Sequence, residues 1–364
     1  MNKFYQLLMT PENQVFCCSF MLGLTGILTI ASSQSAAAMS LRFAMRQSVF
    51  LVLGMIVMLL SSRIPFAFWK KIALPGIGVF WLLLIYLLIW GKPINNMAGW
   101  LRFGSFTFQP TETARGFFLL TLVAVLGYFK EDWKRFPAAV LFAALWLFPV
   151  AMQPDFGMVA AYLISFAVIC FLSGVSKRWL ASIPLAVVAG CWLVTLKHPY
   201  VLRRLTGFLL PDADPLGSGW HIRQFTLAIA RGGWTGSKIG SAMWSNAYLP
   251  FSYNDSAGAA LLETVGLLGA AIPAILFAIF ILSLTRISLR PELNNTRQLV
   301  IAGAAVFAGV QMLLHMGINL TLIPPSGLVL PFISYGGSSL TGFCLLTGIA
   351  LSAARNEKDF AINN

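Results

Sequence analysis

Residues 251–285 have the sequence FSYNDSAGAALLETVGLLGAAIPAILFAIFILSLT, in which a long apolar run follows directly on Asp255. A helix that spans a bilayer needs about 20 predominantly apolar residues, so this run predicts a membrane span. A second acid, Glu263, lies two helical turns into it. An ionisable side chain at membrane depth costs roughly 2.5–3.5 kcal/mol on insertion scales, and such residues are usually functional. Asp255 and Glu263 are therefore candidate functional residues.

The composition is that of a membrane protein. The chain of 364 residues is 58% hydrophobic and only 10% charged, with a mean hydropathy of +0.79. Soluble domains carry about 25% charged residues. We therefore predict an all-α polytopic membrane protein with one domain over residues 1–364 and no large soluble domain. The net charge of +13 does not indicate nucleic-acid binding, because the basic residues fall between apolar runs, where they set topology and contact anionic lipid.

Ten apolar runs predict about ten transmembrane helices. They cover roughly residues 13–33, 46–62, 72–91, 112–129, 136–152, 157–174, 180–196, 257–285, 298–318 and 338–354. An even number places both termini on one side. If that side is the cytoplasm, the inner segments hold 14 Lys and Arg residues and the short outer segments hold 5, namely Arg42, Arg46, Lys92, Arg102 and Arg115. This bias satisfies the positive-inside rule. We expect cytoplasmic termini and a large extracytoplasmic loop between spans seven and eight, at about 197–256.

The predicted outer loop contains an amphipathic segment and a cluster of cations. Between Trp220 and Arg231, apolar residues at 222, 225 and 229 share one helical face, as in an interfacial helix. A glycine-rich stretch follows at 231–240. Either the loop only caps the bundle with its arginines on lipid head groups, or its cations and glycine amides meet a phosphate-bearing ligand. The cations are Arg203, Arg204, Arg223, Arg231 and Lys238.

Acids also begin two other predicted spans. Glu112 follows Gln109-Pro110, and Asp155 follows Gln153-Pro154. Proline is tolerated at helix starts, and an acid in the first turn suits the helix dipole. Capping is therefore one explanation for both acids, and a place in a functional site is the other.

Residues 323–339, IPPSGLVLPFISYGGSS, hold too many prolines and glycines for a continuous helix. Irregular backbone near a membrane is tolerated where it is buried in protein or lines a wet cavity. We expect this segment to re-enter the bundle or to line a cavity near the outer face. The alternative is a tight extracellular hairpin, which gives the hydroxyl-rich end of the segment, with Ser334, Ser338 and Ser339, no purpose.

Five motifs in this order resemble the SEDS family (shape, elongation, division and sporulation), which includes RodA and FtsW. The resemblance covers nearly the whole chain. The motifs are Gly99-Trp100-Leu101-Arg102 with Gln109-Pro110-Thr111-Glu112, then Gln153-Pro154-Asp155-Phe156-Gly157, then Arg204-Leu205 with Pro211 and Asp214-Pro215, then Leu249-Pro250 with Asp255 and Glu263, and lastly Pro325-Ser326-Gly327 with Leu330-Pro331-Phe332-Ile333-Ser334-Tyr335-Gly336-Gly337-Ser338-Ser339. Tyr253 and Asn254 depart from the His and Thr that the family usually has before the acid.

The resemblance implies ten transmembrane helices and a peptidoglycan glycosyltransferase that polymerises lipid II, for cell elongation or division, with a class B penicillin-binding protein. The family's essential acid matches Asp255, which would take the proton from the attacking sugar hydroxyl. Cations or a divalent metal, Mg²⁺ or Mn²⁺, would stabilise the departing pyrophosphate. The sequence identifies no metal ligands. The expected substrate-binding residues are Arg102, Glu112, Asp155, Arg204, Arg223, Lys238, Glu263, Ser334, Ser338 and Ser339.

Two other functions stay open. Polar groups and broken helices in a bundle also mark transport paths, so a flippase or transporter of lipid-linked precursors is one alternative. A SEDS-like scaffold without catalysis is the other, because the neighbours of Asp255 depart from the family pattern. The sequence shows no inverted repeat, and its acids gather at one face instead of the midplane, which favours the enzyme over the transporter.

Overall fold

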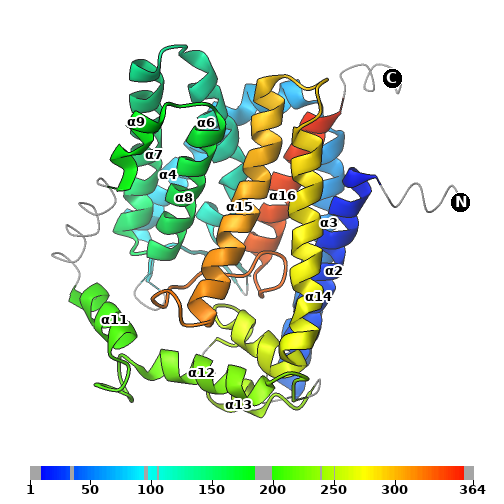
Figure 1. Cartoon of the computed structure of the whole chain (residues 1–364), viewed down its shortest axis with the longest axis vertical. Coiled ribbons are helices and arrows are strands. Elements are labelled where there is room, and N and C mark those ends of the chain that lie inside the picture. The colour runs from blue at the N-terminus through cyan, green and yellow to red at the C-terminus, as the bar shows by residue number, and fades with distance from the viewer. Residues whose placement is uncertain are drawn as a thin grey trace, which may run out of the picture.

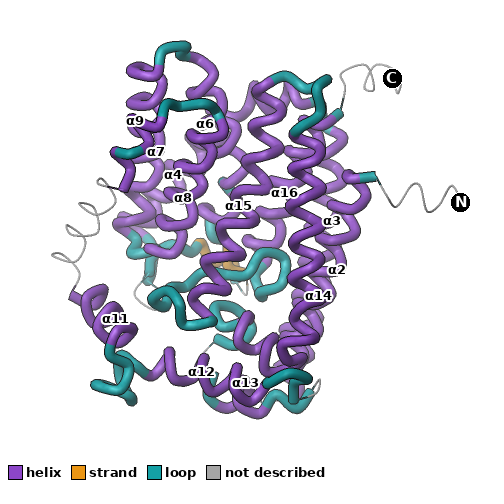
Figure 2. Tube along the Cα trace, in the orientation of Figure 1, coloured by secondary structure: helices purple, strands orange, loops and turns teal. Residues whose placement is uncertain are grey.

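The protein is an α-helical bundle with one short β-hairpin, shown in Figures 1 and 2. The computed structural model describes residues 10–32, 37–93, 97–104, 106–184, 199–237, 240–249 and 251–355. In the hairpin, β1 (Leu101–Phe103) pairs antiparallel with β2 (Phe106–Phe108). The predicted all-α polytopic fold class is confirmed.

Nine apolar helices in the described part of the chain match nine of the ten predicted runs. Seven are long enough to cross a membrane: α2 (Pro11–Ser32), α3 (Ala37–Arg63), α4 (Phe66–Trp90), α7 (Asp132–Met152), α14 (Ala257–Ser288), α15 (Asn295–Asn319) and α16 (Gly337–Ala354). Two are shorter: α6 (Arg115–Tyr128) and α8 (Phe156–Leu172). The one-turn helix α9 (Lys177–Leu180) follows α8. The predicted span at 180–196 lies largely outside the described residues.

The helices α15 and α16 form the centre of the bundle. Figure 1 shows them between α2, α3 and α14 on one side and α4, α6, α7 and α8 on the other. The helix α16 packs on α3, α15 and α6, and α15 packs also on α8 and α14. Because α16 contacts both halves, the segment that enters it holds a central position.

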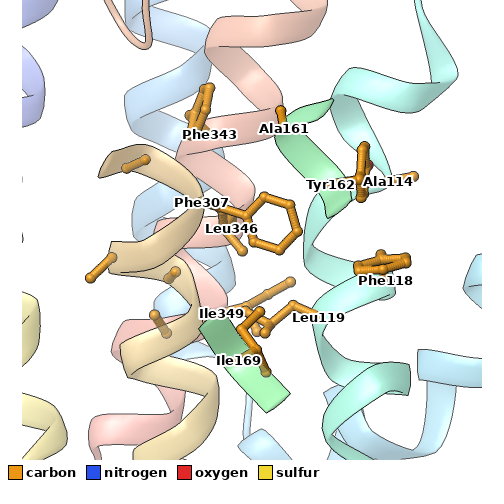
Figure 3. Packing of buried hydrophobic residues seen from close by; sticks show 14 of the residues in the cluster. Ala114, Phe118, Leu119, Ala161, Tyr162, Ile169, Phe307, Phe343, Leu346 and Ile349 are labelled. Atoms are coloured by element: carbon orange, nitrogen blue, oxygen red, sulfur yellow. The ribbon is translucent and has the colours of Figure 1, made fainter. Parts of the chain in front are cut away.

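Three packed aromatic rings join α6 and α8 to the central helix α15. Phe118 of α6, Tyr162 of α8 and Phe307 of α15 are all buried (Figure 3). The ring centroids lie 4.8 Å apart for Phe118 and Tyr162, and 5.4 Å apart for Tyr162 and Phe307, both edge to face. The Tyr162 hydroxyl donates to the Thr111 carbonyl oxygen at 2.7 Å, which satisfies its buried polar end. These three rings and the Tyr162 hydrogen bond therefore join α6, α8 and α15 to the segment that carries Glu112.

The prediction that Arg115 is an outer-loop charge is wrong. The predicted run at 112–129 is divided into α5 (Pro110–Thr113) and α6, and Arg115 is the first residue of α6. Its side chain is fully buried and pairs with Glu112. A basic residue without a partner nearby would stay in water, but an acid three residues earlier lets this one be buried.

Three helices of the predicted outer loop lie across one end of the bundle in Figure 1. They are α11 (Pro199–Leu209), α12 (Trp220–Gly232) and α13 (Met243–Ala247). The helix α12 confirms the predicted amphipathic segment, because Ile222 and Phe225 are buried whereas Arg223 is exposed.

The helix α14 is broken at Gly266, where φ is +69°. Beyond the break, the amides of Leu267 and Leu268 donate to the carbonyl oxygens of Gly233 and Trp234, both at 3.0 Å. Before it, the Glu263 carbonyl accepts the Ser237 amide at 2.9 Å. The glycine-rich stretch thus supplies hydrogen bonds that the broken helix lacks, and these groups are not free for a ligand.

The prediction of an irregular, buried segment between spans nine and ten is confirmed. The chain is non-helical between the end of α15 and the start of α16, and Leu328, Leu330 and Phe332 are buried within it. Figure 2 shows this segment as a loop within the end of the bundle. It is therefore no exposed hairpin.

Candidate active site

A cavity of about 640 Å³ lies between the end of the bundle and the helices α11 and α12. Its walls come from α3, β2, α5, α8, α11, α12 and α16, and from the two irregular segments 251–256 and 325–336. Segments far apart in the sequence therefore meet around one space.

Six of the predicted site residues line this cavity: Asp255, Glu112, Asp155, Arg204, Ser338 and Ser339. Four of the other five lie elsewhere. Ser334 is buried next to the lining, Arg102 is exposed on β1, and Arg223 is exposed on α12. Glu263 is buried in α14 away from the cavity. Lys238 lies outside the described residues.

Asp255 belongs to the turn that leads into α14, and Asn319 at the end of α15 holds that turn. The Asn319 Nδ2 group donates to the Asp255 carbonyl oxygen at 3.1 Å and to the His315 carbonyl at 3.0 Å. Its Oδ1 atom accepts the Ala259 amide at 2.9 Å. One buried amide therefore fixes the backbone on both sides of the start of α14.

His315 is a structural residue of the same region. Its Nε2 atom accepts the Gly258 amide at 3.1 Å, and its Nδ1 atom lies 2.8 Å from the Leu328 carbonyl oxygen. An amide can only donate and a carbonyl can only accept, so the ring is neutral with its proton on Nδ1. His315 therefore bonds the start of α14 to the irregular segment.

A second set of bonds holds the Asp255 turn from the side of α3. The Ser334 hydroxyl donates to the Asn254 carbonyl oxygen at 2.7 Å, and the Tyr335 amide donates to the Tyr253 carbonyl at 2.7 Å. The Gln47 Nε2 group donates to the Ser334 carbonyl at 3.1 Å. Ser334 thus contacts the backbone beneath the cavity and does not line it.

Asp155 caps a helix and also lies in the cavity wall, so capping accounts for part of its position, and its role in a functional site stays a prediction. It is the N-cap of α8, and its Oδ1 atom accepts the Met158 amide at 3.2 Å. Its Oδ2 atom accepts Gln109 Nε2 at 2.9 Å. The backbone N–H of Gln109 donates to the Ser338 hydroxyl at 3.0 Å, which connects this wall of the cavity to the start of α16.

Glu112 is held in a buried ion pair. Its carboxylate contacts the Arg115 guanidinium, which also donates to Gln311 Oε1 at 2.9 Å. The same guanidinium lies 4.1 Å from the centre of the Phe343 ring, within range of a cation–π interaction. The pair joins α5 and α6 to α15 and α16 directly below the cavity.

Glu263 holds the start of α13. Its carboxylate accepts the amides of Trp244 and Ser245 at 2.9 and 2.6 Å, and also the Ser245 hydroxyl. These are the unpaired amides at the start of α13, so Glu263 caps that helix from a distant part of the chain. Its expected contact with substrate stays a prediction.

The electrostatics of the cavity favour a base that titrates near neutrality. Burial raises the pKa of the Asp255 carboxyl to about 7; the Arg204 guanidinium opposes this shift and Glu112 adds to it. Burial likewise raises the pKa of Asp155 to about 7. A general base works best with a pKa close to the operating pH.

The described residues do not form a ready cation site. No three His, Cys, Asp or Glu side chains converge in the part of the chain that the structure describes. Glu112 is paired with Arg115, and both carboxylate oxygens of Asp155 accept hydrogen bonds. The described residues therefore do not define a divalent metal site.

Several residues of the cavity were missed from the sequence. Arg46 of α3 and His221 of α12 both line it, as do Tyr253 and Tyr335. Arg46 was taken only as a topological charge, and His221 carries no pattern of its own. Only their position next to recognisable motifs could have indicated that they belong to the site. His221 lies at the start of the amphipathic helix, and Tyr335 lies in the serine- and glycine-rich segment.

The fold and the site define a polytopic membrane protein with acids, two arginines and serines gathered in one cavity at one end of its bundle. The family model FTSW_RODA_SPOVE, described as a cell cycle protein, matches residues 12–359. The chain therefore belongs to the FtsW/RodA/SpoVE family and is a multi-pass bacterial membrane protein.

Relatives and solved structures agree with this assignment. A probable peptidoglycan glycosyltransferase FtsW from Coxiella burnetii is 31% identical over 93% of this chain and 95% of the relative. The one from Pseudomonas fluorescens is 34% identical over 92% and 85%. A chain from a structure described as a peptidoglycan synthase complex is 25% identical, with a TM-score of 0.78 over 94% of this chain and 96% of the other. RodA of Thermus thermophilus, at 22% identity and a TM-score of 0.66 over 94% and 95%, shares the fold.

Proposed function

We propose that this protein is a peptidoglycan glycosyltransferase that polymerises lipid II, with Asp255 as its general base. The observation that supports this most is the position of Asp255, whose turn is fixed from two sides while its side chain lines the cavity. The relatives named as FtsW supply the reaction class. An anchored acid in an open cavity fits a catalytic role better than a packing role.

The reaction needs one base and a good leaving group. The hydroxyl oxygen of the acceptor sugar attacks the anomeric carbon of the donor, the bond from that carbon to the pyrophosphate oxygen breaks, and Asp255 takes the hydroxyl proton. The polyprenyl pyrophosphate leaves with the electron pair. Arg204 lines the cavity and exerts its positive charge on Asp255, so it is placed to stabilise the pyrophosphate.

The remaining predicted residues take supporting parts in this proposal. Ser338 and Ser339 are placed to hydrogen-bond substrate from the start of α16, and Glu112 and Asp155 shape the wall. The exposed cations Arg102 and Arg223 would meet the lipid-linked substrate outside the cavity. For Lys238, Glu263 and Ser334 the contact rests on sequence alone.

The proposal includes a location and a partner. The cavity end faces the outside of the cytoplasmic membrane, with both termini in the cytoplasm, in accord with the charge bias. The polymer would be cross-linked by a class B penicillin-binding protein, in accord with the peptidoglycan synthase complex among the similar structures.

The test uses purified protein, labelled lipid II and a cognate class B penicillin-binding protein. We expect glycan polymer from the unmodified chain, and none from Asp255→Ala that has the same melting temperature. An absence of polymer with any partner or divalent ion would reject the enzyme and leave the scaffold. Transbilayer movement of lipid II that survives Asp255→Ala, without polymer, would establish the flippase.

Gly327→Ala is expected to reduce polymerisation about tenfold without destabilising the protein. A Cβ atom at Gly327 would lie 3.5 Å from Asp255 Oδ2, an ordinary contact that strains nothing but occupies space where a sugar must approach. The measurement is the rate of polymer formation at saturating lipid II. Gly78→Ala in α4 is the matched control, because a Cβ there meets nothing within 4 Å. Equal rates for the two variants would contradict this steric role.

A further inference from the structure

Four aromatic rings cluster at one side of the cavity. Phe43 of α3 stacks on Tyr253 with the ring centroids 4.8 Å apart and the planes 20° apart. Tyr335 contacts both rings, with its centroid 4.9 Å from Phe43 and 5.8 Å from Tyr253. Phe50, two turns after Phe43, lies 6.2 Å from Tyr335. All four rings line the cavity.

The four rings are less buried than Gln47 and Ser334, the polar residues that bond the backbone around them. Phe43, Phe50, Tyr253 and Tyr335 are half-buried. The anchors Gln47 and Ser334 are buried, with 0% and 3% of their surface exposed. The anchors therefore hold the backbone from within the protein, and the rings keep surface on the side of the cavity.

This aromatic cluster, defined as Phe43, Phe50, Tyr253 and Tyr335, lies beside the proposed base. Tyr253 is two residues before Asp255 in the same turn, and the Asp255 charge contributes to a raised pKa of the Tyr253 hydroxyl, after the larger effect of burial. The phenol therefore stays neutral. The proposed reaction would place a sugar ring within reach of both residues.

We infer that the aromatic cluster binds the apolar face of a substrate sugar ring and so positions the hydroxyl that Asp255 deprotonates. The inference rests on the proposed function and adds a positioning role for Tyr253 and Phe43. A pyranose ring has one face of C–H groups, which pack on an aromatic ring, while its hydroxyls at the edge stay available for hydrogen bonds.

A sugar suits this position better than a polyprenyl tail does. Arg46 is one turn after Phe43 on α3 and lines the same cavity, as do Asp255 and Arg204. A hydrocarbon chain packed there would remove charged groups from water without giving them partners, which is costly. A sugar supplies hydroxyl groups to the charges and an apolar face to the rings.

Binding measurements separate this inference from the proposed function. The protein carries Asp255→Ala, so that substrate is bound but not consumed. Two labelled probes are titrated: lipid II, and undecaprenyl pyrophosphate, which has the same lipid and pyrophosphate but no sugar. The variants on this background are Tyr253→Leu and Phe43→Leu, with Tyr253→Phe as the conservative change. Tyr248→Leu is the control, because Tyr248 is 53% exposed and does not line the cavity.

We expect each cluster leucine variant to raise the Kd for lipid II about tenfold, or about 1.4 kcal/mol, and to leave the Kd for undecaprenyl pyrophosphate unchanged. Tyr253→Phe keeps the ring and should bind lipid II like the Asp255→Ala protein, as should Tyr248→Leu. Equal lipid II affinity in all variants would overturn the inference, and so would equal weakening of both probes. If the chain without cluster substitutions binds neither probe, the proposed function itself fails.

Discussion

Replacing Arg115 by methionine is expected to lower the free energy of unfolding by about 3–5 kcal/mol. The substitution leaves the Glu112 carboxylate buried without its cation, and it removes the bond to Gln311 and the contact with the Phe343 ring. These contacts join four helices beneath the cavity. The measurement is thermal or denaturant unfolding of the purified protein in detergent.

Two further variants test whether burial of the charge is the cause. Arg290→Met breaks an ion pair with Glu12 in which both side chains are about 30% exposed, and it should cost less than about 1 kcal/mol. The double variant Arg115→Met with Glu112→Gln removes both charges and should recover part of the stability. Equal losses for Arg115→Met and Arg290→Met would show that burial of the pair contributes little.

The rate of polymerisation is expected to fall about tenfold for each pH unit below about 7. A raised carboxyl pKa means that the base is protonated, and therefore inactive, over the acid range. With a pKa of about 7 for Asp255, about 1% of the carboxylate is ionised at pH 5. The measurement is the initial rate of glycan polymer formation between pH 5 and pH 9. A rate independent of pH below 7 would contradict the role of Asp255 as the base.

The titration of Asp155 must be distinguished from that of Asp255 in this pH profile, because burial raises the pKa of Asp155 to a similar value. In Asp155→Asn the rate should still fall on the acid side of about pH 7, whatever its plateau. Arg204→Gln removes the cation that holds the pKa of Asp255 down, so its profile should shift to higher pH. Loss of the pH dependence of the rate in Asp155→Asn would assign the titration to Asp155 instead.

The membrane spans and the composition of the site could be predicted because they depend on local patterns. Apolar runs predict spans through their length, and the amphipathic α12 follows from residues at helical spacing. The predicted topology placed Glu112, Asp155 and Asp255 near the outer face, and all three line one cavity.

Other features could not be predicted, because they depend on pairs of residues distant in sequence. The apolar run at 257–285 gives no sign of a break at Gly266, since glycine is common in membrane helices. The contacts of Glu263 with the start of α13 exist only in the folded chain. Arg115 was assigned to a loop by its charge, whereas its burial depends also on Gln311, which lies 196 residues later in the chain.

The break in α14 has a consequence for how the protein enters the membrane. A helix interrupted in lipid would carry bare peptide groups that hydrocarbon cannot satisfy. Their partners come from residues 233–237, which precede α14 in the chain and are already synthesised when this span is made. The order of synthesis thus provides the bonding groups before they are needed. A second piece that begins after residue 237 should consequently integrate poorly when it is expressed alone, and better when the first piece is co-expressed.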